Sequence, residues 1–206
     1  MKVNYKIIMD KEIEYVKALE EKPRLLLHVC CAPCSSAVLE ELSEFFKITL
    51  FFYNPNISPE SEFLFRLDEL KRLVYEMDLK DVDIYVPEYD ESEFFEIAKG
   101  MEDIPEGGKR CEKCYRLRLL KSILYAKEND FDYVTTTLTI SPYKNAQWLN
   151  EIGSELSEKY KVKYLFSDFK KGDGYKRSCD LSRKYNLYRQ DYCGCIYSKN
   201  LREQQS

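Results

Sequence analysis

Cysteines are the residues of this 206-residue chain most able to do chemistry, and seven of the eight occur in three short motifs. The first motif, HVCCAPCSS, has two adjacent thiols and a third thiol three residues later. The second motif is a C-x-x-C pair, and the third is a C-x-C pair. The seven positions are Cys30, Cys31, Cys34, Cys111, Cys114, Cys193 and Cys195. Thiolates at these spacings can bind metal or exchange electrons as a dithiol, so the sequence predicts a metal or redox centre.

Two of the motifs together supply enough thiolates for a metal centre. Cys111 and Cys114 lie on the first turn of a predicted helix, where free backbone N–H groups favour thiolate. Cys30 and Cys31 follow a predicted strand. Four thiolates suit a [4Fe–4S] cluster or structural zinc. The surplus thiols favour iron, because a structural zinc site leaves Cys34 and the C-x-C pair without a role.

Other classes of protein also use such motifs. Cys31-Ala-Pro-Cys34 after a strand is typical of a thioredoxin-like thiol oxidoreductase, but that explanation uses only two of the eight cysteines. A zinc-stabilised RNA-binding module would use four thiols without catalysis. Enzymes that activate tRNA with ATP have glycines in the loop after the first strand, and CCAPCSS has none. We therefore do not expect ATP to be used.

Two further residues could take part in the chemistry. Cys179 has no partner nearby in the sequence, so we expect a buried structural cysteine. His28 is the only histidine and lies two residues before Cys30. We expect it to be a core residue with satisfied hydrogen bonds. The alternative is a role as an acid or as a donor to a metal ligand.

Alternating strands and helices are predicted to position these residues. Short apolar or β-branched runs predict strands over 24–29, 47–54, 82–89, 131–140 and 162–169. Apolar residues at helical spacing predict helices over 34–45, 61–77, 91–101, 111–129 and 145–160. This order indicates an α/β fold, a parallel sheet with helices on both faces. Chemistry in such folds gathers beyond the carboxyl ends of the strands, where the sequence places Cys30, Asn54, Asn56, Ser141 and Asp168.

Length and composition predict a single domain over residues 1–206. Residues 1–23 are expected to form an N-terminal extension or helix, and residues 170–206 a C-terminal helix with a Cys-rich tail. The charged N-terminus does not resemble a signal peptide, and no run is long enough to cross a membrane. We therefore expect a cytoplasmic protein with no membrane partner. Clustered cysteines in a reducing cytosol more often serve metal or redox chemistry than structural disulfides.

Charge is distributed unevenly along the chain. The net charge is −4, yet residues 1–100 hold 12 basic and 21 acidic side chains, and residues 101–206 hold 20 and 15. The basic residues concentrate in 109–121 and 170–189. This asymmetry indicates a polyanionic partner, and ordinary solvated helix faces are the alternative explanation.

Four stretches together resemble one known family. They are HVCCAPCSS, CEKCYRLR, TTTLTISPYKN and LYRQDYCGC. The combination, over residues 22–198, resembles epoxyqueuosine reductase of the QueH type, the form that needs no cobalamin. The resemblance implies a fold of the adenine-nucleotide α-hydrolase type and a [4Fe–4S] cluster. It also implies removal of the epoxide oxygen from epoxyqueuosine at the wobble position of tRNA, the last step of queuosine synthesis.

The resemblance allows a role to be expected for each motif thiol. The thiols expected to hold the cluster are Cys30, Cys31, Cys111 and Cys114. We expect Cys34, Cys193 and Cys195 to bind a second metal ion, with iron as the candidate. In the alternative, Cys193 and Cys195 form a dithiol that supplies an electron pair.

The expected partner is the tRNA anticodon stem-loop that carries epoxyqueuosine. An electron donor such as a ferredoxin or a flavodoxin is expected to restore the enzyme. The residues expected to contact the RNA or the modified base are Arg116, Ser141, Tyr143, Lys144 and Arg189.

Overall fold

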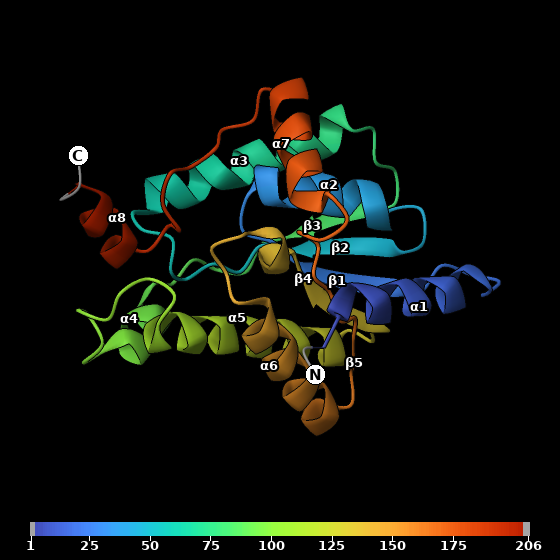
Figure 1. Cartoon of the computed structure of the whole chain (residues 1–206), viewed down its shortest axis with the longest axis horizontal. Coiled ribbons are helices and arrows are strands. Elements are labelled where there is room, and N and C mark those ends of the chain that lie inside the picture. The colour runs from blue at the N-terminus through green and yellow to red at the C-terminus, as the bar shows by residue number, and fades with distance from the viewer. Residues whose placement is uncertain (1–2, 204–206) are drawn as a thin grey trace.

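The computed structural model describes residues 3–203, and its centre is a five-stranded sheet in the order β3-β2-β1-β4-β5 (Figure 1). Every neighbouring pair of strands is parallel. The strands are β1 Arg24–His28, β2 Lys47–Phe51, β3 Val82–Tyr85, β4 Tyr133–Thr136 and β5 Lys163–Tyr164. The α/β prediction is confirmed. A thioredoxin-like protein needs a mixed sheet, so the parallel order excludes that alternative.

Helices cover both faces of the sheet (Figure 1). They are α1 Tyr5–Lys17, α2 Ala32–Leu42, α3 Glu60–Glu76, α4 Ser92–Ala98, α5 Lys109–Glu128, α6 Ala146–Tyr160, α7 Gly174–Lys184 and α8 Ile196–Glu203. Side chains of α1, α2, α3 and α7 share one apolar core, and those of α5 and α6 share the other. β1 serves both cores, because Leu25 and Leu27 point into the first and Leu26 into the second. Among the described residues, no helix is both long and apolar enough to cross a membrane.

The fourth strand is shorter than predicted. The β-branched run predicts a strand over 131–140, but β4 ends at Thr136 and a 3₁₀ helix, Thr137–Ile140, follows. The Thr136 hydroxyl accepts the Leu138 N–H and so begins this turn. Thr139 bonds the hydroxyl of Ser167 at 2.9 Å. Three of the threonines that raised the strand propensity here, Thr135, Thr136 and Thr139, are buried hydrogen-bonding groups, which propensity does not distinguish.

The fifth strand is also shorter than predicted, and β5 covers only two residues of the predicted 162–169. Beyond β5, the side chain of Asn150 makes the backbone hydrogen bonds that a neighbouring strand would otherwise make. This side chain accepts the N–H of Ser167 at 2.9 Å and donates to the Ser167 carbonyl oxygen at 2.8 Å. Asp168 therefore lies in the segment after β5 and not at a strand end. It is buried, and its carboxylate pairs with Lys170 at 2.9 Å.

The C-terminal part contains two helices where the sequence predicted one. α7 packs against α2, and α8 begins at Ile196, directly after the last cysteine. The segment between these helices crosses back towards the amino-terminal end of α5 (Figure 1). This return path brings the C-x-C pair to the edge of the sheet where β1 ends.

Candidate metal and redox centre

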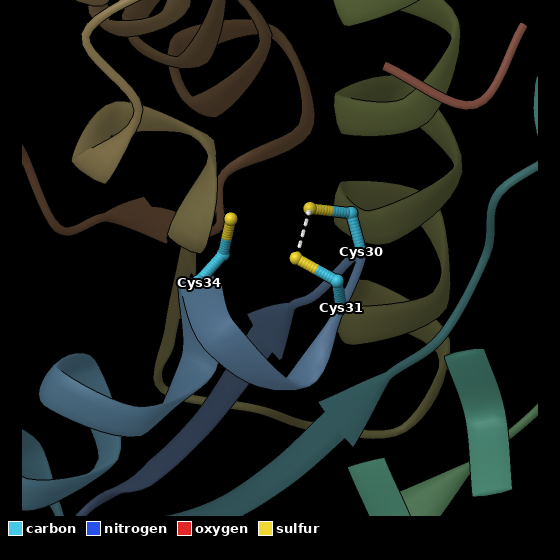
Figure 2. A group of neighbouring side chains, drawn as sticks. All are labelled: Cys30, Cys31 and Cys34. Atoms are coloured by element: carbon cyan, nitrogen blue, oxygen red, sulfur yellow. Dashed lines mark hydrogen bonds between the residues drawn. The ribbon is translucent and has the colours of Figure 1, made fainter. Parts of the chain in front are cut away.

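Cys30, Cys31 and Cys34, here called the thiol triad, lie together where β1 ends and α2 begins (Figure 2). Their three Sγ atoms lie within 4.8 Å of one another, and those of Cys30 and Cys31 are 3.7 Å apart. Cys31 is the N-cap of α2, and Pro33 occupies the first turn, where its missing N–H has no helical partner. Hydrogen bonds from the thiols of Cys31 and then Cys34 hold the pKa of Cys30 well below its usual value. Cys30 is therefore the first thiol of the triad to ionise.

The other four motif thiols surround a second, smaller cavity. Cys111 and Cys114 lie at the start of α5, and Cys193 and Cys195, here called the tail thiols, come from the segment between α7 and α8. The cavity measures about 10 Å³. Cys111 also packs against the apolar core that contains two triad cysteines, so the two groups are neighbours. All eight cysteines are free thiols.

Side-chain and backbone contacts fix the tail thiols. Arg66 on α3 donates from Nη1 to the Cys193 carbonyl oxygen at 3.2 Å. The Cys193 N–H donates to the Ser198 hydroxyl at 3.2 Å. Gly194 has a φ of +116°, and a Cβ there would lie 2.9 Å from Ile57 and 3.1 Å from Arg66. Only glycine fits between the two tail thiols without displacing these neighbours.

Cations face the thiols from three different parts of the fold. Arg118 on α5 is 1% exposed and is influenced by Cys114, Cys30 and Cys193. Arg66 approaches the triad from the opposite side, on α3. Lys144 follows the 3₁₀ helix. Burial lowers the pKa of Lys144, but the charges of nearby thiolates raise it by more, and the net shift is upward. The positive charges at this end of the sheet therefore stabilise several thiolates.

A larger cavity of about 340 Å³ opens beside the triad. Cys30, Cys34 and Cys193 line it, so thiols from both groups are reachable from one space. Residues 140–144 and the face of α7 with Tyr175 form other parts of its wall. This volume is within the range of cavities that bind small molecules or a single nucleotide.

A family model described as epoxyqueuosine reductase QueH matches residues 25–201. The chain belongs to this family. A QueH protein of Streptococcus pyogenes serotype M1 is 40% identical over 203 residues, which cover 97% of this chain and 80% of that protein. A QueH protein of Staphylococcus epidermidis is 42% identical and covers 96% and 85% of the two chains. The one from Thermotoga maritima is 36% identical and covers 84% and 89%.

A solved structure outside the QueH family has a similar fold. It is the U34-tRNA thiolase NcsA from Methanococcus maripaludis with its [4Fe–4S] cluster. The TM-score is 0.53 at 11% sequence identity, and the match covers 97% of this chain and 73% of that chain. At this identity the likeness shows the fold alone. It agrees with the fold that the motif resemblance implied.

The structure brings together most of the residues predicted to contact substrate. Ser141, Tyr143, Lys144 and Arg189 all line the larger cavity. Arg116 does not line it, because its guanidinium makes two hydrogen bonds to Glu155, at 2.8 and 2.6 Å, on the exposed side of α5. For all five residues, contact with a substrate stays a prediction.

His28 and Cys179 can be compared with their predicted roles. Nδ1 of His28 lies 2.8 Å from the Thr136 hydroxyl, and Nε2 accepts from Arg118 at 3.2 Å. The prediction of a satisfied core histidine is confirmed. The prediction that Cys179 is buried is wrong, because its side chain is partly exposed on α7 beside Tyr175. The prediction rested on the lack of a nearby cysteine partner, but α7 lies at the surface, where a side chain can stay half-buried.

Arg66 and Gln190 belong to the site but were not predicted from the sequence. Arg66 looks like one more charge in an amphipathic helix, yet it lies three residues after Phe63 and four before Leu70, on the buried stripe of α3. A charge on an apolar stripe is the pattern that could have identified it. Gln190 precedes the C-x-C motif and lines the larger cavity, and its Oε1 is buried without a hydrogen-bond partner among the described residues. No feature of the sequence distinguishes Gln190 from a surface residue.

Proposed function

We propose that this chain reduces epoxyqueuosine to queuosine in tRNA, at the cavity beside the thiol triad. The observation that carries the proposal is the gathering of seven free thiols at one sheet edge, three of them lining a 340 Å³ cavity. Membership of the epoxyqueuosine reductase QueH family supplies the substrate. The thiols supply the reducing chemistry that such a substrate needs.

The reaction consumes two electrons and two protons for each epoxide. Both C–O bonds of the epoxide break, the oxygen leaves as water, and the two carbons become an alkene. Oxidation of two thiols to one disulfide releases two electrons and two protons. A dithiol therefore balances the reaction, and an external donor such as a ferredoxin or a flavodoxin would then reduce the disulfide.

The residues present fit a [4Fe–4S] cluster. Cys30, Cys31, Cys111 and Cys114 provide four thiols from two segments, none of them in a disulfide. Cys111 packs against the core that contains Cys30 and Cys31, and Arg118 is influenced by thiols of both segments. When bound, such a cluster supplies electrons one at a time. The protein's part is to hold four thiolates, to exclude water by burial and to balance their charge with buried cations.

The remaining motif thiols are suited to the substrate side. Cys34 and Cys193 line the larger cavity, and Cys195 lies behind them, buried. We assign these three thiols either to a second metal ion, iron being the candidate, or to redox chemistry by the Cys193–Cys195 pair. In the first case the ion would polarise the epoxide oxygen, and in the second the pair would supply the electrons.

One distance favours a second way to divide the thiols. Two thiolates on one tetrahedral ion, each at about 2.3 Å, lie about 3.8 Å apart. Cys30 and Cys31, at 3.7 Å, have this spacing. In a cubane cluster each thiolate binds a different iron, so the sulfurs lie farther apart. In this second division the triad holds the single ion, and the thiols around the small cavity hold the cluster.

Substrate binding is assigned to the walls of the larger cavity. We assign Ser141 and Lys144, which line the cavity, to the modified base, and the ammonium of Lys144 is held in its charged form by nearby thiolates. Tyr143 is 73% exposed at the rim, and Arg189 donates to the Ser182 hydroxyl beside it. An exposed aromatic ring and a cation at a rim suit the bases and phosphates of the anticodon loop. We assign Arg116, which pairs with Glu155 on the outer side of α5, to phosphates outside the cavity.

The test combines metal analysis with turnover. Protein purified without oxygen is assayed for iron, sulfide and zinc, and its visible spectrum is recorded. It is then incubated with tRNA carrying epoxyqueuosine and a chemical reductant, and the nucleosides are analysed by mass spectrometry. We expect broad absorption at about 400 nm, typical of iron–sulfur thiolate centres, and conversion of epoxyqueuosine to queuosine. Colourless protein with one zinc and no conversion would instead establish the zinc-stabilised RNA-binding module.

A further inference from the structure

Arg118 differs from Arg66, which has a carboxylate partner, and from Arg110, whose guanidinium is bound by backbone carbonyl oxygens. Arg66 pairs with Glu62 at 2.7 Å. Arg110 donates from Nη1 to three backbone carbonyl oxygens of the loop 101–104. Arg118 is equally buried, and its hydrogen bonds go to the neutral side chains described next, with no carboxylate within ion-pair distance in residues 3–203. A buried charge is costly unless an opposite charge compensates it. The counter-charge of Arg118 must therefore come from another kind of group.

Two neutral side chains hold the guanidinium in place. Nε donates to His28 Nε2 at 3.2 Å, and Nη2 donates to Asn54 Oδ1 at 2.6 Å. The His28 ring accepts this hydrogen bond at Nε2, so that nitrogen carries no proton and the ring adds no opposite charge beside the guanidinium. Thr136 holds the other nitrogen of this ring, so the ring is fixed at both ends. These contacts orient the guanidinium without cancelling its charge.

Arg118 lines the small cavity together with Cys114 and Cys193. Burial lowers the pKa of Arg118, but the charges of nearby thiolates raise it by more. These thiolates are Cys114, Cys30 and Cys193, in order of influence. Cys30 follows β1 and Cys114 lies on α5, so the guanidinium lies between the two segments that supply the proposed cluster ligands. We propose that Arg118 is a fixed positive charge that raises the reduction potential of the centre held by these thiolates, positioned by His28 and Asn54. This inference rests on the proposed function.

The direction of the effect follows from charge. Four thiolates outweigh the positive charge of an iron–sulfur core, and each added electron makes the centre more negative. A cation nearby stabilises the reduced form more than the oxidised form, and net charge and hydrogen bonds to sulfur set cluster potentials. Burial matters as well, because salt and water screen a buried charge much less than an exposed one.

The chain offers a matched control for the experiment. Arg116 is two residues earlier on the same helix, but it is exposed and paired with Glu155. Wild type, Arg118→Gln, Arg118→Lys and Arg116→Gln are reconstituted with iron and sulfide without oxygen. Redox titrations followed by visible absorption then give each reduction potential. We expect a more negative potential for Arg118→Gln, and values close to wild type for Arg118→Lys and Arg116→Gln.

A second variant tests the charge while the arginine stays in place. Asn54→Asp puts a carboxylate beside Nη2, neutralises the guanidinium and should also lower the potential. A potential unchanged in both Arg118→Gln and Asn54→Asp would overturn the inference. If neither variant retains the cluster, Arg118→Lys decides between charge and shape. Loss of the cluster in this charge-conserving variant as well would show that the shape of arginine, and not its charge, is required, and would overturn the inference. A wild type that assembles no cluster would overturn the proposed function itself, a result that these variants cannot imitate.

Discussion

The thiols at the ends of β1 and α5 and the thiols of the tail reach the same site in different ways. Cys30 and Cys31 follow a central strand, and Cys111 and Cys114 lie on the first turns of a long helix, so regular structure places all four. The tail thiols lie in a segment without regular structure and are held by Arg66 and by the Ser198 hydroxyl. The difference indicates a rigid half of the centre and a half that depends on side-chain anchors. Metal held permanently suits the first half, and thiols that change oxidation state suit the second.

The largest expected effect comes from removing one thiol of each half. Cys114→Ser should lose the iron–sulfur absorption and all turnover, because one of four ligands is gone. Cys195→Ser should keep the absorption and lose turnover, because the tail pair can no longer form a disulfide. Iron and sulfide analysis with the tRNA conversion assay measures both. Loss of the cluster in Cys195→Ser would instead favour the division in which the tail thiols are cluster ligands.

A change that moves the tail without removing a thiol gives the next largest effect. Gly194→Ala brings a Cβ to 2.9 Å from Ile57 at a φ of +116°. We expect a cost of about 1–3 kcal/mol in the free energy of unfolding and a clear loss of turnover, with cluster absorption retained. Gly100→Ala is the control, because Gly100 has a φ of +73° and open space around it. Equal turnover in the two variants would show that the tail geometry is not needed for reduction.

The same contrast explains what the sequence could predict. The strands and helices that carry Cys30 and Cys111 have clear periodic patterns, and the thiols at their ends could be placed at one edge of a parallel sheet. The tail could not be placed, because its position depends on Arg66, 127 residues earlier in the chain. Such a contact leaves no periodic pattern. The Asn150 side chain that ends β5 early is a second case, since one amide replaces the expected strand pairing at Ser167.

Substrate contacts at the rim are expected to have intermediate effects. Tyr143→Ala should raise the KM for tRNA by roughly 5- to 150-fold, the equivalent of about 1–3 kcal/mol for one lost base stack. Tyr143→Phe should be close to wild type, because the ring remains. Tyr75→Ala is the control, since Tyr75 is 85% exposed on α3 and does not line the cavity. Steady-state kinetics with an anticodon stem-loop checks this, and a change in kcat with KM unaltered would contradict a stacking role.

The smallest expected effect concerns a single cation at the rim. Arg189 is exposed, lines the cavity, and its guanidinium lies 5.9 Å from the Tyr175 ring centre. If it contacts one phosphate, Arg189→Gln should reduce the slope of log affinity against log salt by about 0.7–1. Turnover at saturating tRNA should change little, because the thiols are untouched. Arg183→Gln is the control, since Arg183 lies on α7 outside the cavity and pairs with Asp180. Equal salt slopes in the two variants would remove Arg189 from the RNA-binding surface and leave the rim to its aromatic residues.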